Sequence, residues 1–296
     1  MLRFLHTQAA FLFNEKAAVQ AINLTKNKPI NNKKAMFKQR CFRLLLLASA
    51  IAASLSAAAY DFESAGIYYN ITGNNTVEVT YSDRDNNTYS GSVSIPETVT
   101  NNGTEYSVTT IGESAFKGSA VTSVYMPESI TSIGTSAFSG CENLESVALP
   151  ESLTTLGSEA FRSCKLLKTI KIPSGVTTIP FRCFYGCLSL ESVTIPEGVT
   201  AIEADAFGSC NLNALKLPES LTTLGSNAFE SCKSLKTIKI PSGVTAIPGY
   251  CFENCSSLES VTIPEGVTTI GERAFQDCIY NHRTTKTNQK YPSVNL

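Results

Sequence analysis

The chain of 296 residues contains no tryptophan and only two histidines, His6 and His282. Neither histidine belongs to a motif that would place a nucleophilic serine or cysteine beside it. The sequence also lacks both common glycine-rich phosphate-binding motifs. These absences argue against hydrolase chemistry and against nucleotide binding. We therefore expect a protein that is not an enzyme and that needs no cofactor.

Charged residues make up only 17% of the chain, and they are unevenly distributed. Residues 1–59 hold nine of the 24 lysines and arginines but one of the 25 acidic residues, so the rest of the chain is clearly acidic. Binding to nucleic acid requires clustered positive charge, because phosphate contacts dominate its affinity. The composition therefore predicts that nucleic acid is not a partner.

A short apolar segment explains the basic N-terminal region. Three basic residues precede the apolar run 44–55, and three alanines follow it. This order is typical of a secretory signal peptide, which we predict over residues 36–59 with cleavage before Tyr60. The alternative, a membrane anchor, needs about 20 apolar residues. Residues 1–35 are predicted to be an upstream extension, and the mature protein is expected to be secreted or at the cell surface, without a stable membrane span.

From Ile95 onward the sequence repeats every 22 or 23 residues. Proline, phenylalanine and cysteine each recur at this spacing. The prolines are Pro127, Pro150, Pro173, Pro196, Pro218, Pro241 and Pro264; the phenylalanines are Phe116, Phe138, Phe161, Phe184, Phe207, Phe229, Phe252 and Phe275; the cysteines are Cys141, Cys164, Cys187, Cys210, Cys232, Cys255 and Cys278. Such a period in a frame of Leu, Ile and Val is typical of a leucine-rich repeat solenoid.

Each repeat has the pattern of one solenoid coil. In Ser260–Ile263 polar and apolar residues alternate, which predicts a half-buried strand, and the proline that follows ends it. Ala274 and Phe275 are expected on a short helical turn. A single coil cannot bury its apolar face alone, so neighbouring coils must stack. We predict a β-rich solenoid of about eight coils over residues 95–278, built from short parallel strands and short helical turns.

The two ends of the solenoid differ in sequence. Residues 60–94 contain β-rich segments on either side of Asn74, which predict a β-hairpin-like cap over the first coil. Residues 279–296 do not continue the pattern and are predicted to be an irregular tail. The absence of a recognisable C-terminal cap leaves two alternatives. Either the chain is truncated, or a partner covers the last coil, which includes self-association through that coil.

The repeated motifs I-G-x-x-A-F-x-x-C and V-x-I-P resemble those of the BspA-type leucine-rich repeat family. The resemblance extends over residues 95–278, most of the mature chain. Members of this family are mainly secreted or cell-surface proteins, and several are adhesins that bind host matrix proteins or other cells. The resemblance therefore implies surface binding rather than catalysis. Longer members carry C-terminal anchoring modules, and no such module is recognisable in this chain.

The ten cysteines favour buried thiols over disulfides or zinc. The side chains of cysteines at equivalent positions of stacked coils would point in the same direction. A disulfide instead needs a Cβ–S–S–Cβ dihedral angle near 90°. Ser119 stands in the cysteine position of the first coil, so a small residue is sufficient there. The pairs Cys183–Cys187 and Cys251–Cys255 each offer two ligands, and a zinc site needs four around one ion. No metal site is predicted.

The outward positions of the predicted strands form the candidate binding surface. Six exposed side chains are the candidates for contact with an extracellular protein or glycan ligand. They are Tyr125, Lys168, Lys171, Lys216, Lys236 and Lys239. A cross-strand charge ladder that only stabilises the sheet is an equally good interpretation of each residue.

Two further alternatives concern the whole chain. Residues 153–210 and 221–278 are identical at 43 of 58 aligned positions, which indicates that a block of three coils was duplicated recently. The protein is predicted to be an adhesive binding protein. The alternatives are a structural or assembly module that packs through its last coil, and a truncated duplicate without independent function.

Overall fold

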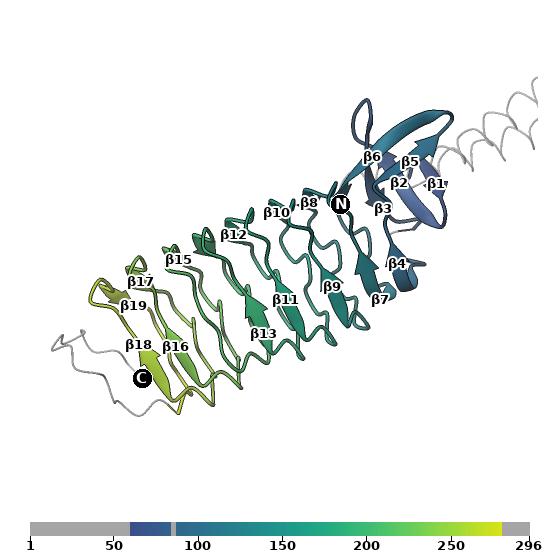
Figure 1. Cartoon of the computed structure of the whole chain (residues 1–296). Coiled ribbons are helices and arrows are strands. Elements are labelled where there is room, and N and C mark those ends of the chain that lie inside the picture. Colours follow the sequence, from purple (N-terminus) through teal and green to yellow (C-terminus); the bar gives the residue numbers. More distant parts are fainter. Residues whose placement is uncertain (1–59, 84–86, 280–296) are drawn as a thin grey trace, which may run out of the picture. The chain divides into compact units, whose positions relative to one another are not determined.

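The computed structural model describes residues 60–83 and 87–279. The predicted extension, the signal peptide and residues 280–296 of the predicted tail lie outside these residues. Within the described part, every regular element is a β-strand and none is a helix. The β-rich solenoid that the repeats predict is confirmed (Figure 1).

The N-terminal part contains a three-stranded meander and a separate hairpin. β1 (Phe62–Ser64), β2 (Ile67–Ile71) and β3 (Thr76–Thr80) form an antiparallel meander, in which β2 and β3 flank the expected turn. β5 (Thr98–Asn101) and β6 (Thr104–Ile111) form a separate hairpin. β6 pairs in parallel with β3, so the meander joins the solenoid edge to edge. This pairing covers the strand edge that the first coil would otherwise expose.

Two rows of short parallel strands run along the solenoid. The first row consists of β4 (Ser90–Ser94), β7 (Ala120–Tyr125), β9 (Ser146–Ala148), β11 (Thr169–Lys171), β13 (Ser192–Thr194), β16 (Thr237–Lys239) and β18 (Ser260–Thr262). The second row continues from β6 through β8 (Ser132–Ile133), β10 (Thr155–Leu156), β12 (Thr178–Ile179), β14 (Ala201–Ile202), β15 (Thr223–Leu224), β17 (Ala246–Ile247) and β19 (Thr269–Ile270). We call the outward side of the first row the strand face. β4 lies within residues 60–94, yet it pairs with β7 as the first strand of this row.

The segments expected as helical turns are chains of β-turns. Two residues per coil, four positions apart, have φ between +52° and +75°, and this interrupts any helix. In one coil, Ser139 donates its N–H to the carbonyl of Ser136 at 3.0 Å, which closes a turn. The N–H groups of Ser136 and Phe138 instead reach the carbonyls of Ser158 and Ala160 in the next coil, at 2.8 and 2.7 Å. The turns therefore form an inter-coil ladder of their own.

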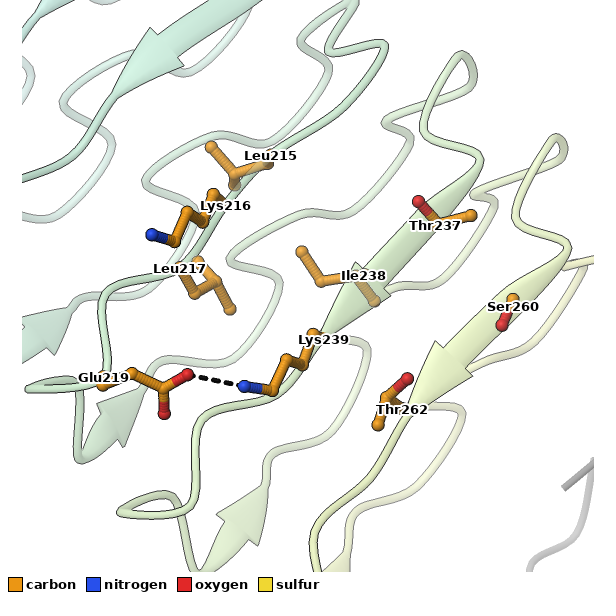
Figure 2. Close-up of a pocket in the computed structure, with 9 residues that line it drawn as sticks. All are labelled: Leu215, Lys216, Leu217, Glu219, Thr237, Ile238, Lys239, Ser260 and Thr262. Atoms are coloured by element: carbon orange, nitrogen blue, oxygen red, sulfur yellow. Dashed lines mark hydrogen bonds and ion pairs between the residues drawn. The ribbon is translucent and has the colours of Figure 1, made fainter. Parts of the chain in front are cut away.

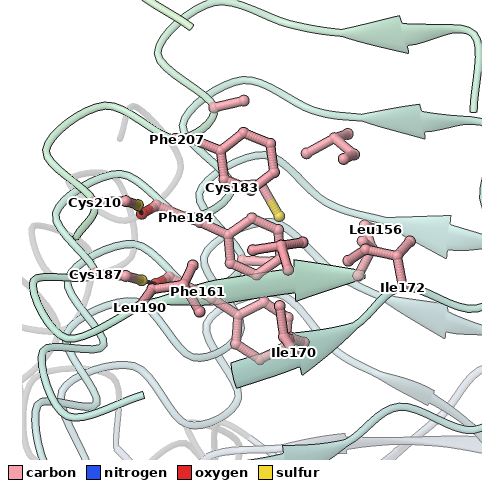
Figure 3. Packing of buried hydrophobic residues seen from close by; sticks show 14 of the residues in the cluster. Leu156, Phe161, Ile170, Ile172, Cys183, Phe184, Cys187, Leu190, Phe207 and Cys210 are labelled. Atoms are coloured by element: carbon pink, nitrogen blue, oxygen red, sulfur yellow. Dashed lines mark hydrogen bonds between the residues drawn. The ribbon is translucent and has the colours of Figure 1, made fainter. Parts of the chain in front are cut away.

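The phenylalanines form a continuous stack through the core. Successive rings from Phe116 to Phe275 lie 4.9–5.6 Å apart between centroids, with interplanar angles of 1–8°. Figure 3 shows three of these rings, from Phe161, Phe184 and Phe207, lined up across neighbouring coils. Tyr89 extends the stack into the N-terminal part, with its ring 4.6 Å from Phe116. Every coil thus adds one ring to a single core.

The cysteines of the repeat are thiols that donate hydrogen bonds to the backbone of the preceding coil. Cys187 Sγ donates a hydrogen bond to the carbonyl of Phe161 at 3.1 Å, and the other periodic cysteines make the equivalent bond. No disulfide occurs among the described residues. Burial raises the pKa of Cys141 to about 11 and the pKa values of Cys187 and Cys232 to about 12. Ser119 replaces cysteine in the first coil, where its hydroxyl lies 3.5 Å from Cys141 Sγ.

Candidate functional site

All six candidate residues are exposed on the strand face, in two columns. Lys168 and Lys236 immediately precede β11 and β16. Tyr125, Lys171, Lys216 and Lys239 occupy the column nearer the prolines, one position per coil. The full column, one residue per coil, is Tyr125, Ala148, Lys171, Thr194, Lys216 and Lys239.

Tyr125 is separated from the lysines of its own column. It is 63% exposed, and it lies two coils from Lys171, with Ala148 between them. Stacked strands are about 4.8 Å apart, so this separation is roughly 10 Å. The structure brings Lys216 and Lys239 into neighbouring coils, but it does not bring Tyr125 into contact with either.

Two of the lysines are neutralised by glutamates of the preceding coil. Lys171 Nζ lies 2.5 Å from Glu151 Oε1, and Lys239 Nζ lies 2.6 Å from Glu219 Oε1. The hydrogen bond from the lysine and its positive charge lower the pKa of each glutamate. Both pairs are solvent-exposed, so their contribution to stability is small.

Lys216 differs from its counterparts because its glutamate is occupied elsewhere. Glu197 accepts hydrogen bonds from the backbone N–H groups of Glu219 and Ser220, each at 3.3 Å. Within the described residues, Lys216 forms no ion pair, and the same holds for Lys168 and Lys236. Figure 2 shows Lys239 turned toward Glu219, while the Lys216 side chain lies beside that pair without joining it.

The coil of Lys216 also lacks the strand that every other coil contributes to the first row. Residues 214–217 form no strand, and within the described part their backbone N–H and carbonyl groups have no hydrogen-bond partner. The nearest inter-coil bond runs from Asn213 N to the carbonyl of Glu191, at 3.2 Å. The first row is accordingly interrupted between β13 and β16, and it is also interrupted between β9 and β11, where both coils still contribute a strand.

The local sequence explains the missing strand. Residues 213–217 read N-A-L-K-L, without a β-branched residue, whereas the coils on either side have S-V-T-I and T-I-K-I. Asparagine and alanine are disfavoured in strands, and β-branched residues are favoured. The coil is also one residue shorter between Cys210 and Leu212. This shortening alone does not explain the missing strand. The segment from Ser119 to Val121 is equally short, and β7 still pairs on both sides.

Two shallow hollows flank Lys216 where the pairing is lost. The first has a volume of about 310 Å³ and is shown in Figure 2. The second has a volume of about 300 Å³. The first is lined by Leu215, Lys216, Leu217, Glu219, Thr237, Ile238, Lys239, Ser260 and Thr262, and the second by Val193, Thr194, Ile195, Glu197, Lys216 and Pro218. Lys216 is the side chain that both hollows share.

Sequence reasoning missed a second, half-buried cluster, on the turns. The Arg182 guanidinium lies over the rings of Phe181 and Tyr185, at 4.7 and 5.6 Å from their centroids, and Arg182 Nε is 3.2 Å from Asp205 Oδ2. The duplicated block has Gly249 in the position of Phe181, so the cluster is not repeated there. That difference between two nearly identical blocks was the available sequence signal.

The described residues contain no group of three or more His, Cys, Asp or Glu side chains that could hold a metal ion. They also contain no helix with the length and apolar character needed to cross a membrane.

The stacked coils, the buried leucine frame and the exposed strand face define a leucine-rich repeat protein. The model of the BspA type leucine-rich repeat region matches in six copies, over residues 85–194, 109–236 and 177–293. The chain belongs to this family. No curated protein sequence matches the chain.

Solved structures of bacterial leucine-rich repeat proteins are similar to this chain. A leucine-rich cell surface protein from Faecalibacterium prausnitzii is 27% identical, with a TM-score of 0.52 over 75% of each chain. A leucine-rich repeat protein of T. pallidum is 26% identical, with a TM-score of 0.49 over 74% of this chain and 89% of that one. The pneumococcal vaccine antigen PcpA is 15% identical, with a TM-score of 0.50 over 73% and 79%, and shares the fold alone.

Proposed function

We propose that this chain is a secreted or cell-surface binding protein that contacts an extracellular protein or glycan through its strand face. The observation that carries the proposal is the strand face itself, whose exposed polar side chains are backed by one uninterrupted core. A rigid face suits binding because its residues do not have to be ordered on contact. Membership of the family and similarity to a cell-surface protein support the extracellular location.

An array of extracellular-matrix proteins and glycans, probed with the purified full chain, tests this proposal. The test variant is the triple substitution Lys171→Glu, Lys216→Glu and Lys239→Glu. The matched control changes the same number of exposed lysines outside the strand face, at Lys117, Lys165 and Lys233. Selective binding that only the first variant loses would support the strand face. Binding that both variants retain, or no binding by a folded wild type, would reject it.

A second candidate function is self-association through the last described coil. The observation that favours it is Ile279, an apolar side chain that is 60% exposed beside that coil. β18 and β19, the last described strands, each pair with one neighbour among the described residues. Light scattering over a dilution series distinguishes the two candidates. A mass that stays monomeric at every concentration would reject self-association and would leave binding through the strand face unaffected.

A further inference from the structure

We infer that the two hollows beside Lys216 form one site for consecutive residues of a linear polysaccharide that contains uronic acids. This inference rests on the proposed function, because it names the ligand class that the strand face would bind. It depends on the charge, the hydrogen-bonding groups and the arrangement of the hollows.

The charge of the site fits isolated carboxylates. Lys216 is the unpaired cation between the hollows, and Lys239 in the first hollow is already neutralised by Glu219. Glu197 in the second hollow adds a negative charge that would repel a densely charged polymer. A polysaccharide with one carboxylate per sugar carries fewer negative charges than a heavily sulfated chain, so one of its carboxylates can lie on Lys216 with less repulsion from Glu197.

The hydrogen-bonding groups of the site fit sugar hydroxyls. The backbone of residues 214–217 offers N–H donors and carbonyl acceptors that have no partner within the described part. Exposed hydroxyls of Thr194, Thr237, Ser260 and Thr262 line the two hollows. A sugar hydroxyl both donates and accepts, so it can satisfy either kind of group. Every such bond replaces a bond to water, so each adds little affinity. The arrangement of donors and acceptors along the site would give the specificity.

The placement of the hollows indicates a linear ligand. The second hollow lies between β13 and the coil of Lys216, and the first extends from that coil to β18. They meet at Lys216, so a chain that runs along the stacking direction would occupy both. A single terminal sugar would fill only one.

An acidic peptide is a less suitable ligand for these hollows. Peptides are usually held by aromatic or aliphatic anchors in deep pockets. The apolar side chains of the first hollow are almost completely covered, with Leu215, Leu217 and Ile238 only 7%, 4% and 3% exposed. They provide a floor for a sugar ring rather than a cavity for an anchor residue.

Titration calorimetry with an oligogalacturonate of uniform length tests the inference on the purified full chain. The same oligomer with its carboxylates reduced to alcohols, a polyglutamate peptide and a dextran sulfate are the comparison ligands. The test variant is Lys216→Gln, and the matched control is Lys168→Gln, which removes an exposed and unpaired lysine of the same face outside both hollows. Circular dichroism checks that both variants keep the wild-type fold.

We expect the wild type to bind oligogalacturonate and to bind the reduced oligomer, the peptide and the sulfated polymer more weakly. Lys216→Gln should lower the affinity about tenfold, the effect of losing one charge-assisted hydrogen bond, and Lys168→Gln should not change it. The inference is overturned if the reduced oligomer or the peptide binds equally well, or if both variants have the same effect. If oligogalacturonate fails while the array finds a protein ligand, the inference falls and the proposed function stands. If nothing binds, both fall.

Discussion

Replacement of Phe184 by alanine removes one ring from the middle of the phenylalanine stack. The Phe184 side chain is fully buried, and its ring lies 5.6 Å from that of Phe161 and 5.4 Å from that of Phe207. The cavity left by a buried phenylalanine costs about 3–5 kcal/mol, and this value includes the two stacking contacts that are lost. Because a whole domain is stabilised by only about 5–15 kcal/mol, this single change removes a large fraction of the total.

Urea unfolding followed by far-ultraviolet circular dichroism measures this loss, since the chain has no tryptophan to serve as a fluorescent probe. Tyr125→Ala is the control, because that exposed ring should change stability by about 0.5 kcal/mol or less. A loss of less than about 1 kcal/mol for Phe184→Ala, with an unchanged denaturant slope, would refute the argument that the stack is the structural core. A changed slope would mean that the coils no longer unfold together.

Three other predictions concern the N-terminal part, the turns and the thiols. Tyr89→Phe should cost about 1–3 kcal/mol in urea unfolding, because the hydroxyl donates to the carbonyl of Thr80 at 2.7 Å and accepts from Tyr68 N at 2.9 Å. A neutral result would show that water replaces both bonds. Gly157→Ala should lower the melting temperature, at a cost of about 1–3 kcal/mol, because a Cβ there would lie 2.4 Å from backbone atoms of the preceding coil. An unchanged melting temperature would contradict this close approach. Since burial raises the pKa of Cys187 to about 12, the unfolded chain loses this proton at lower pH than the folded chain. The contribution of this thiol to the free energy of unfolding, measured in reducing buffer, should therefore be constant between neutral pH and about pH 8 and should fall as the pH rises from there toward 12, and a rise over that interval would contradict the assignment.

The repeat spacing was sufficient to predict the coils, the parallel strands and the buried thiols. Phe184 and Cys187 recur at fixed positions, and a residue that recurs once per coil must meet its own copies when coils stack. The same reasoning failed for the turns. Ser136 adopts a positive φ although serine has no strong preference for it, so nothing in its identity distinguishes a chain of β-turns from a helical turn.

The candidate site was less predictable because it depends on side chains from different coils. Lys171, Lys216 and Lys239 are equivalent by sequence position, yet of these three only Lys216 lacks an ion pair within the part of the chain that the structure describes. That difference follows from whether the glutamate one coil earlier points to the lysine or binds the backbone, and sequence spacing does not specify a rotamer. The hollows depend in addition on the lost pairing at residues 214–217, which reflects the combined effect of several weak preferences.

The coil-by-coil construction also determines how the protein would respond to a pulling force. Each coil is held by its two neighbours, so coils can detach one at a time rather than all together. A released coil of about 23 residues would lengthen the chain by up to about 80 Å when fully extended. Among the described residues, the coil of residues 214–217 contributes no strand hydrogen bonds to the first row and is held there by its second-row strand and its turns. A solenoid built in this way would lengthen under load by the release of single coils rather than by the loss of the whole fold.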